Sequence, residues 1–230
     1  MSCGANDKKE EITGVEVQNK KPSKKITRKK PPKKNKKAGN TKNSESTTAT
    51  DADKSSSIEF ENSSMVNMLA NKISNYAINN GYSTDLCFLV DMSMPSGRNR
   101  FFVYDLNKNK IVNAGLVAHG SCNKSYLSTA KFSNLSNSGC SSAGKYKVGE
   151  FYRGKYGKSF RLYGLDNSNS NAFSRAVVIH GYDCVPDKEI YPRVLCNSFG
   201  CVMVSYKFFD RLSTYISQSN KPIVLWVYGS

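Results

Sequence analysis

The spacing of apolar residues divides residues 58–230 into a helix followed by short strands. Between residues 62 and 81, apolar side chains recur three or four positions apart. Asn62 or Ser63 can cap this helix, and Gly81 would end it. Its expected buried positions are Val66, Leu69, Ala70, Ile73 and Ala77. Short apolar runs bounded by turn residues then predict strands over residues 86–90, 101–104, 111–117, 146–148, 161–165, 176–179, 201–204 and 222–228.

A second, shorter helix is predicted over residues 206–217, directly before the last strand. Many short strands separated by turn signals are typical of an all-β architecture with helices packed against it. We therefore expect a mainly β fold, a β-sandwich or open barrel with an N-terminal helix and a short C-terminal helix. No apolar run approaches the roughly 18 residues that a membrane-spanning helix needs.

Residues 1–57 differ from the rest of the chain in composition. They hold 15 Lys and Arg against 7 Asp and Glu, and residues 40–57 are rich in Ser, Thr and Asn. Such a segment cannot bury enough apolar area to offset the entropy lost on ordering. We predict a disordered basic tail and linker over residues 1–57, and one folded domain over residues 58–230.

The candidate chemistry lies near the C-terminal end. The chain has two histidines, His119 and His180, and each ends a strand-like run and precedes a glycine. After His180, 17 residues lead to Ser198-Phe199-Gly200-Cys201. A thiol nucleophile needs a base within hydrogen-bond reach and backbone N–H groups aimed at the oxyanion. Gly200 removes the Cβ that would obstruct a substrate beside Cys201. The alternative is that both side chains are buried structural residues.

This arrangement resembles the YkuD-like L,D-transpeptidase catalytic domain, and especially its more divergent branch. The family pattern is His-Gly, then 14 to 17 residues, then Ser/Thr-His-Gly-Cys. His180 and Gly181 match the first element, and three of the four positions of the second match, with Phe199 replacing a histidine. The resemblance covers residues 60–228 and includes the stretches 132–134, 141–146, 154–157, 161–165 and 171–176.

The resemblance implies a Cys–His acyl transfer. Cys201 would attack a peptide carbonyl as a thiolate, and His180 would accept its proton and return it to the leaving amine. The carbonyl of Gly181 would orient the imidazole, and the N–H groups of Gly200 and Cys201 would bind the oxyanion. Ser198 would either donate a hydrogen bond from its hydroxyl or shape the turn. This chemistry places the thiol beside the imidazole in a groove open to solvent.

The implied substrate is a peptidoglycan stem peptide, cut at an L-to-D bond with release of a D-amino acid. An amine acceptor would give a cross-link, and water would give an L,D-carboxypeptidase. Arg175 and Arg193 are candidates for binding a substrate carboxylate, because guanidinium offers a planar fork of donors. His119 would either line the substrate groove or bond to the backbone at a strand end. No cofactor is implied. A non-catalytic cell-wall-binding module is the alternative function.

The seven cysteines offer further constraints. Cys87 lies in an apolar strand and is expected to be buried. Cys184 with Cys196, and Cys122 with Cys140, are two candidate disulfide pairs for an oxidising compartment. A zinc site built from His119, Cys122, His180 and Cys184 is a different interpretation, but it leaves the Ser-x-Gly-Cys element unexplained.

The basic tail and the first residues bear on location. Residues 1–20 lack the pattern of a signal peptide, yet the implied substrate lies in the cell envelope or periplasm. Ser2-Cys3-Gly4 is similar to the end of a bacterial lipobox, which would anchor the protein through a lipid on Cys3. The tail would then contact anionic envelope polymers or lipid head groups, or act as a solvated spacer. It lacks interleaved aromatic residues, so specific nucleic-acid binding is not expected.

Overall fold

The computed structural model describes residues 51–229, with side chains described from residue 64 onward. The predicted tail and the candidate lipid site at Cys3 therefore lie outside the described residues, except for residues 51–57. Those residues belong to the first helix, α1, which runs from Asp51 to Asn80. Because the helix starts at Asp51, the predicted caps at Asn62 and Ser63 are wrong. Ser and Asn cost only a few tenths of a kcal/mol inside a helix, so a capping residue does not have to start one.

The buried face of α1 follows the predicted spacing. All five expected positions are buried, and the first four of them pack in one cluster with residues of the sheet; the five are Val66, Leu69, Ala70, Ile73 and Ala77. The helix ends where Gly81 adopts a positive φ of 73°. The amide of Tyr82 then donates to the carbonyl of Ala77 at 3.1 Å, as in a Schellman cap. Neither described helix combines the length and the hydropathy that a membrane crossing requires.

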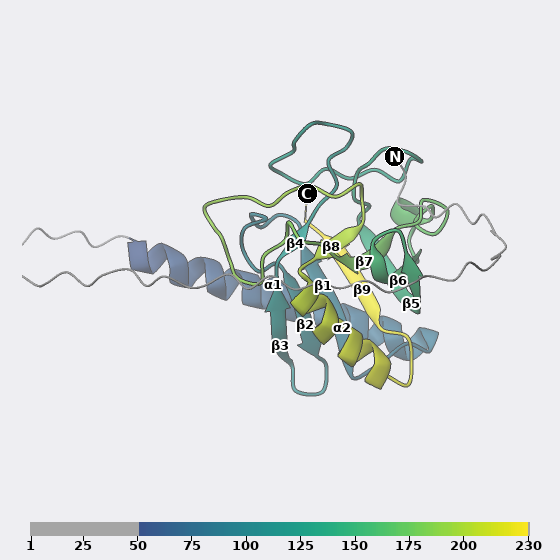
Figure 1. Cartoon of the computed structure of the whole chain (residues 1–230). Helices are drawn as coiled ribbons and strands as arrows, with labels where there is room; N and C mark the ends of the chain where they lie inside the picture. Colours follow the sequence, from purple (N-terminus) through teal and green to yellow (C-terminus); the bar gives the residue numbers. More distant parts are fainter. Residues whose placement is uncertain (1–50, 230) are drawn as a thin grey trace, which may run out of the picture.

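The described residues form one nine-stranded mixed sheet, ordered β3-β2-β1-β9-β5-β6-β7-β8-β4. The strands are β1 (Leu86–Asp91), β2 (Phe101–Asp105), β3 (Lys110–Gly115), β4 (Val117–Ala118), β5 (Gly144–Gly154), β6 (Gly157–Gly164), β7 (Val178–Gly181), β8 (Val202–Val204) and β9 (Val224–Tyr228). The helix α2 (Tyr206–Gln218) connects β8 to β9, as predicted. The mainly β architecture with one helix at each end is thus confirmed (Figure 1).

The two edges of this sheet are joined by a single residue. β3 and β4 occupy opposite edges, yet only Leu116 separates them in the chain. A flat sheet of nine strands would hold its edges tens of ångströms apart, because neighbouring strands are about 4.8 Å apart. The sheet must therefore curl until its edges nearly meet, which makes it an open barrel. The single strand predicted over residues 111–117 is in fact these two edge strands.

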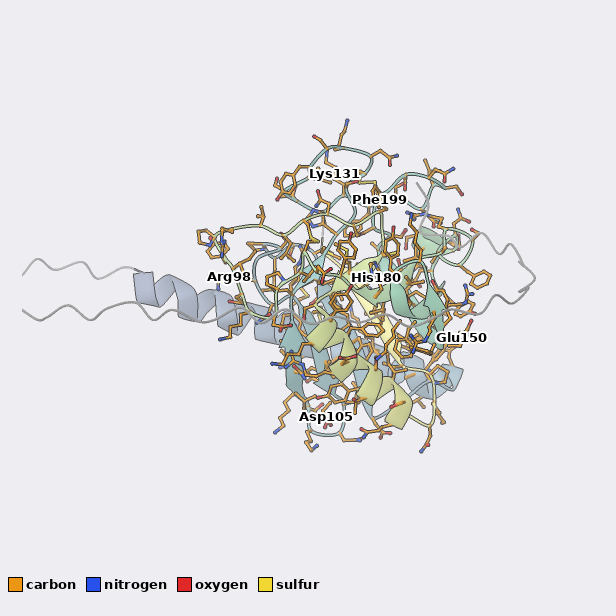
Figure 2. All side chains as sticks on the ribbon, in the orientation of Figure 1. Arg98, Asp105, Lys131, Glu150, His180 and Phe199 are labelled. Carbon is orange, nitrogen blue, oxygen red and sulfur yellow. A yellow bond between two sulfur atoms is a disulfide. The ribbon has the colours of Figure 1, made fainter. Side chains whose placement is uncertain are left out.

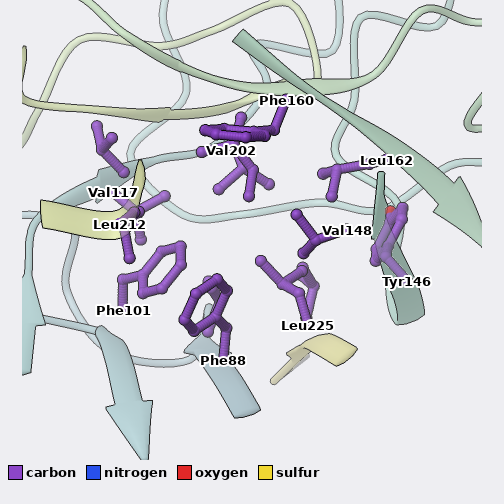
Figure 3. Packing of buried hydrophobic residues seen from close by; sticks show 14 of the residues in the cluster. Phe88, Phe101, Val117, Tyr146, Val148, Phe160, Leu162, Val202, Leu212 and Leu225 are labelled. Atoms are coloured by element: carbon purple, nitrogen blue, oxygen red, sulfur yellow. The ribbon is translucent and has the colours of Figure 1, made fainter. Parts of the chain in front are cut away.

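The interior of the barrel is an apolar core in which alternate residues of the strands point inward (Figure 3). Phe88 and Phe101 enter from β1 and β2, and Leu225 enters from β9. Helix α2 adds Phe208, whose ring meets that of Phe101 edge to face at 5.2 Å. Its amphipathic face therefore helps to seal the barrel.

The outer face of the sheet is covered by two different structures. Over β1, β2 and β9 it is covered by α1. Over β4 and β8 it is covered by the loop that joins β7 to β8, through Val185 and Leu195, which pack on Met203. The outer face of β7 and β8 thus lies between this loop and the β5–β6 hairpin. The candidate residues lie there.

Candidate active site

The pairing of β7 with β8 brings His180 and Cys201 to one face of the sheet. The two strands are parallel, with Ile179 opposite Val202 and His180 opposite Met203. Ile179 and Val202 point into the barrel, so the neighbouring positions 180 and 201 face outward. The same register, continued by one residue, places Cys201 opposite Val178 on the neighbouring strand. The backbone of Cys201 is therefore displaced from that of His180 by about 5 Å across the sheet and by two residues, about 7 Å, along the strands.

Tyr156 contacts both halves of this arrangement. Its ring stacks on the imidazole of His180 with 4.7 Å between centroids. It also packs against the cluster formed by Val178 and Cys201. Tyr156 stands at the tip of the β5–β6 hairpin, between Gly154 and Gly157. The structure thus places on one face of the sheet the two residues that the sequence predicted as nucleophile and base, and Tyr156, which the sequence did not indicate, contacts both.

The imidazole of His180 has a defined tautomer. Its Nδ1 lies 3.1 Å from the carbonyl oxygen of Gly181, which can only accept a hydrogen bond. Nδ1 therefore carries the proton and Nε2 holds the lone pair. Burial lowers the pKa of His180 below its ordinary 6.5, and the bond to Gly181 opposes that shift. The ring is neutral at pH 7 and can accept a proton at Nε2.

The expectation of a groove open to solvent is wrong for this structure. Cys201 is 1% exposed and His180 is 2% exposed. The cover includes Tyr152 and Tyr156 from the β5–β6 hairpin, about 45 residues before the thiol in the chain. The Sγ of Cys201 donates to the carbonyl of Ala176 at 3.8 Å. A substrate can reach this thiol only after part of this cover moves.

Ser198 shapes the turn that carries Cys201. Its Oγ donates to the carbonyl of Cys201 at 2.8 Å and accepts from the amide of Gly200 at 3.1 Å. This supports the turn-shaping alternative for Ser198. It also gives the Gly200 amide a partner inside the protein, whereas we expected that amide to bind the oxyanion. Gly200 has a φ of 107°, and a Cβ there would lie 2.6 Å from the carbonyl oxygen of Cys140. Only glycine fits this position.

His119 is buried, with hydrogen bonds at both ring nitrogens. The guanidinium of Arg100 donates to its Nδ1 at 2.9 Å, so Nε2 carries the proton and donates to the carbonyl of Leu127 at 3.0 Å. Burial and the neighbouring Arg100 lower the pKa of His119 to about 4. The side chain links a strand end to the loop around Leu127. These contacts favour the backbone-bonded alternative over a role in the substrate groove.

Arg175 lies behind the nucleophile turn rather than on the surface. Its guanidinium donates to the carbonyls of Ser133 and Cys140, at 2.7 and 2.6 Å, and also to the hydroxyls of Ser138 and Ser142. One of its terminal nitrogens lies 3.2 Å from the Cβ position of Gly200. Arg175 thus ties the loop before β5 to the turn that holds Cys201. Its predicted contact with a substrate carboxylate would compete with these bonds.

Arg193 is exposed on the loop between β7 and β8. Its backbone is packed closely against Gly97, since a Cβ on that glycine would lie 1.9 Å from the carbonyl oxygen of Arg193. This contact places Arg193 against the loop between β1 and β2. Phe199, which stands where the family pattern has a histidine, is 47% exposed. Figure 2 labels it together with His180. The ring of Phe199 offers an apolar surface next to the turn of the nucleophile.

Both predicted disulfides are present. Cys122 is bonded to Cys140, and Cys184 is bonded to Cys196. The zinc interpretation is therefore wrong, because two of its four ligands are oxidised. Cys87 and Cys201 are the cysteines of the described part that form no disulfide. Within that part, no group of three or more His, Cys, Asp or Glu could hold a metal ion.

Sequence reasoning missed the aromatic residues around His180. Tyr182 meets the rings of Tyr156 and His180 edge to face, with centroids 6.1 and 6.2 Å apart. A cavity of about 520 Å³ opens beside this cluster, between the hairpin tip and α2. A signal was available in the sequence, because the tip reads Gly-Lys-Tyr-Gly, a tight turn with an exposed aromatic residue. Its contact with a strand two elements away could not be derived from that pattern.

The fold and the Cys–His face can be compared with known proteins. A family model described as the L,D-transpeptidase catalytic domain, YkuD_2, matches residues 54–228. Because the match spans most of the chain, the protein belongs to this family. No curated protein sequence matches the chain.

Similar solved structures are distant. The carbamoyl enzyme of Ldtfm with avibactam shares 14% identity and a TM-score of 0.41, covering 64% of this chain and 49% of its own. An L,D-transpeptidase from Xylanimonas cellulosilytica DSM 15894 shares 13% identity and a TM-score of 0.37, covering 67% and 68%. A variant of the helical cell shape determining protein Pgp2 from Campylobacter jejuni shares 15% identity and a TM-score of 0.40, covering 65% and 49%. The chain spans about half the length of the first and third of these proteins.

Proposed function

We propose that this domain is a cysteine-dependent acyltransferase that acts on peptidoglycan stem peptides as an L,D-transpeptidase. The observation that carries the proposal is the common outer face of β7 and β8, where Tyr156 contacts both Cys201 and the imidazole of His180, whose Nε2 holds the lone pair. Membership of the L,D-transpeptidase catalytic domain family supplies the substrate class. The ordered tautomer of His180 supplies the base.

The reaction starts when the hairpin tip moves and the thiol turns from the carbonyl of Ala176 toward His180. Nε2 of His180 accepts the thiol proton, and the sulfur attacks the carbonyl carbon of an L-to-D peptide bond. The carbonyl of Gly181 holds the imidazolium in place through Nδ1–H. The C–N bond then breaks, the D-amino acid leaves with the proton from Nε2, and a thioester on Cys201 remains.

The second half of the reaction consumes the thioester. An amine or a water molecule gives its proton to His180 and attacks the thioester carbonyl, and the C–S bond breaks. An amine yields a cross-link, and water yields a shortened stem. The backbone N–H of Cys201 is the proposed oxyanion donor. The Gly200 amide would join it only if its bond to Ser198 opened.

Mass analysis of purified stem peptides incubated with the protein tests the proposal. We expect the wild type to release a D-amino acid, and Cys201→Ala to release none while keeping its unfolding temperature. Cys87→Ala is the matched control, because it removes the other unoxidised thiol of the described part, and it should retain activity. An inactive wild type, or an active Cys201→Ala variant, would contradict the proposal.

The burial of both reacting groups favours one alternative, a non-catalytic cell-wall-binding module. The acyltransferase and the binding module differ in one reaction, the acylation of Cys201. A carbapenem-type acylating probe should add its mass to Cys201 in an enzyme and should leave a binding module unmodified, although both would be pulled down with sacculi. This measurement separates the alternatives even when turnover is slow.

We propose a cell envelope or periplasmic location for the protein. The two disulfides support it, because such bonds persist in oxidising compartments. A lipid on Cys3 and contacts between the basic tail and anionic polymers or lipid head groups belong to the same proposal. Labelling cells with a radioactive fatty acid tests the lipid, with Cys3→Ser as the control, and an unlabelled wild type would refute it.

A further inference from the structure

The cavity beside His180 has walls of unusual composition. It measures about 520 Å³, within the range of small-molecule sites. Its lining residues come from the β5–β6 hairpin, the residue after β7 and the first turns of α2; they include Arg153, Lys155, Tyr156, Lys158, Tyr182 and Asp210. The hairpin supplies three cations, and α2 supplies one carboxylate. The cavity therefore favours an anionic ligand.

Two further features bear on this positive potential, one reducing it and one adding to it. The ion pair in this wall, among the residues that the structure describes, joins Lys158 to Asp210 at a long 3.8 Å. It offsets one of the three positive charges. The first turn of α2, which begins at Tyr206, forms the opposite wall and adds the positive end of a 13-residue helix. Positive charge thus approaches the cavity from both sides.

The cavity adjoins the imidazole through one aromatic ring. Tyr156 forms part of the cavity wall and also stacks on His180. Tyr182 lines the same cavity and meets both rings edge to face. When Tyr156 moves aside to open the thiol, the cavity and the imidazole share one space. A ligand in the cavity then lies beside the group that gives and takes the proton.

The chemistry of acyl transfer says which group enters from this side. His180 protonates the departing amine, and it deprotonates the incoming amine by the same step in reverse. Leaving group and acceptor must therefore occupy the same position beside His180. The group that departs from an L-to-D bond at the end of a stem is a D-amino acid, which carries a carboxylate. Its natural partners are a guanidinium and ammonium groups.

We propose that this cavity binds the carboxylate of the amine that leaves or enters the acyl-enzyme, through Arg153, Lys155 and Lys158. The cavity should make acceptors that carry a free carboxylate beside the reacting amine, such as free amino acids, better acceptors than the corresponding amides. This inference rests on the proposed function, and it names the ligand class of the acceptor side. In the transfer step the new C–N bond forms, the C–S bond breaks, and the amine proton passes through His180 to the thiolate of Cys201.

The test compares D-alanine with D-alaninamide as acceptors for one acyl-enzyme. Mass analysis gives the ratio of exchanged to hydrolysed product, which does not depend on how fast the thioester forms. We expect the wild type to prefer D-alanine, and Lys155→Gln and Lys158→Gln to reduce that preference by about two- to fivefold each, as partly exposed ion pairs do. Lys110→Gln, on an exposed lysine of the β2–β3 hairpin, is the control and should leave it unchanged.

A binding measurement tests the cavity without turnover. D-alanine should shift the NMR signals of the hairpin tip in the Cys201→Ala variant in a saturable way, and D-alaninamide should shift them less. Equal acceptor use by the wild type, an unchanged preference in the Lys155→Gln and Lys158→Gln variants, or equal shifts from both ligands would each overturn the cavity proposal. A wild type that forms no thioester would refute the proposed function instead, and the NMR titration would still decide on the cavity.

Discussion

The ring of Tyr156 lies nearly parallel to the imidazole of His180, with 4.7 Å between centroids and 20° between planes. This contact joins the tip of the β5–β6 hairpin to β7. The two strands β6 and β7 pair over only three residues of β6, Ser159 to Arg161. The contact between the two rings covers the base from solvent and closes one side of the cavity. The reactivity of the site is therefore tied to the position of one side chain.

Replacing Tyr156 by alanine should expose the thiol. Aromatic stacking contributes about 0.5–1.5 kcal/mol beyond area burial, so its loss should raise the population of open molecules roughly two- to tenfold. We expect Cys201 to react with iodoacetamide faster by that factor, measured by intact mass at neutral pH. Tyr126→Ala, on an exposed tyrosine of another loop, is the control. An unchanged rate in the Tyr156 variant would show that the ring is not the cover.

The pH dependence of activity should follow His180. Burial lowers the pKa of its imidazole below 6.5, and only the neutral ring can accept the thiol proton. Activity should therefore be complete at neutral pH and fall as the pH drops through that lowered pKa. The acid midpoint of kcat/KM should lie below 6.5 in the wild type and move up in Tyr156→Ala, because the ring is then better solvated. A midpoint above 6.5 would contradict this.

Stability at low pH should depend on His119. Its pKa is about 4 in the folded protein and 6.5 in an unfolded chain, so the unfolded state binds a proton that the folded state does not. The free energy of unfolding should fall as pH drops from 6.5 to about 4, with about 3 kcal/mol of the loss due to His119. Urea unfolding at several pH values measures this. His119→Gln should lose less stability over that range, and an equal loss would refute the assignment.

The strands could be predicted from the sequence because their cause is local. Apolar runs such as Phe101–Tyr104, bounded by turn residues, favour extended backbone wherever they finally pair. The closure of the barrel could not be predicted, because it depends on which strands pair at the two edges. The break at Leu116 follows Gly115, and a single glycine in an apolar run indicates a bend or bulge but not a change of sheet edge.

The candidate site was predicted in part for the same reason. The nucleophile and the base lie at the ends of recognisable runs, and Gly200 marks the turn between them. The cover over Cys201 comes from Tyr156, which is distant in sequence and close only in the folded protein. The Gly200 amide also has a local competitor in the hydroxyl of Ser198, two residues away. Residue types alone do not decide whether the Gly200 amide donates to the Ser198 hydroxyl or to a substrate oxygen.

Arg175 should be more important for stability than for substrate affinity. Its fork of donors reaches two carbonyls and two hydroxyls, and the single ammonium of lysine cannot span them. Arg175→Lys should lower the free energy of unfolding by about 2 kcal/mol or more, because hydrogen bonds from a buried charged group are lost. Arg193→Lys, at an exposed position, should change it by less than about 0.5 kcal/mol. A raised KM with unchanged stability in Arg175→Lys would instead support the carboxylate-binding role.

The two disulfides should affect the site differently. They close loops of similar length, with sequence separations of 18 and 12, so removing either should cost about 3 kcal/mol of stability on the loop-entropy model. Of the four cysteines, only Cys140 contacts the nucleophile turn. Its carbonyl accepts a hydrogen bond from Arg175 at 2.6 Å, and it lies so close to Gly200 that a Cβ on that glycine would clash with it. Freeing Cys140 should therefore disturb the turn that carries Cys201.

Paired alanine variants separate stability from positioning. Cys122→Ala with Cys140→Ala should slow acylation of Cys201 by about 10- to 100-fold, as small displacements of a nucleophile do. Cys184→Ala with Cys196→Ala should unfold at a similarly reduced urea concentration. It should acylate faster than the first pair, because its disulfide braces the cluster around Val185 and Leu195 and not the turn that carries Cys201. Acylation is measured under conditions in which both variants are folded. If both pairs slow acylation equally, the loss comes from general loosening of the domain, and Cys140 does not position the nucleophile.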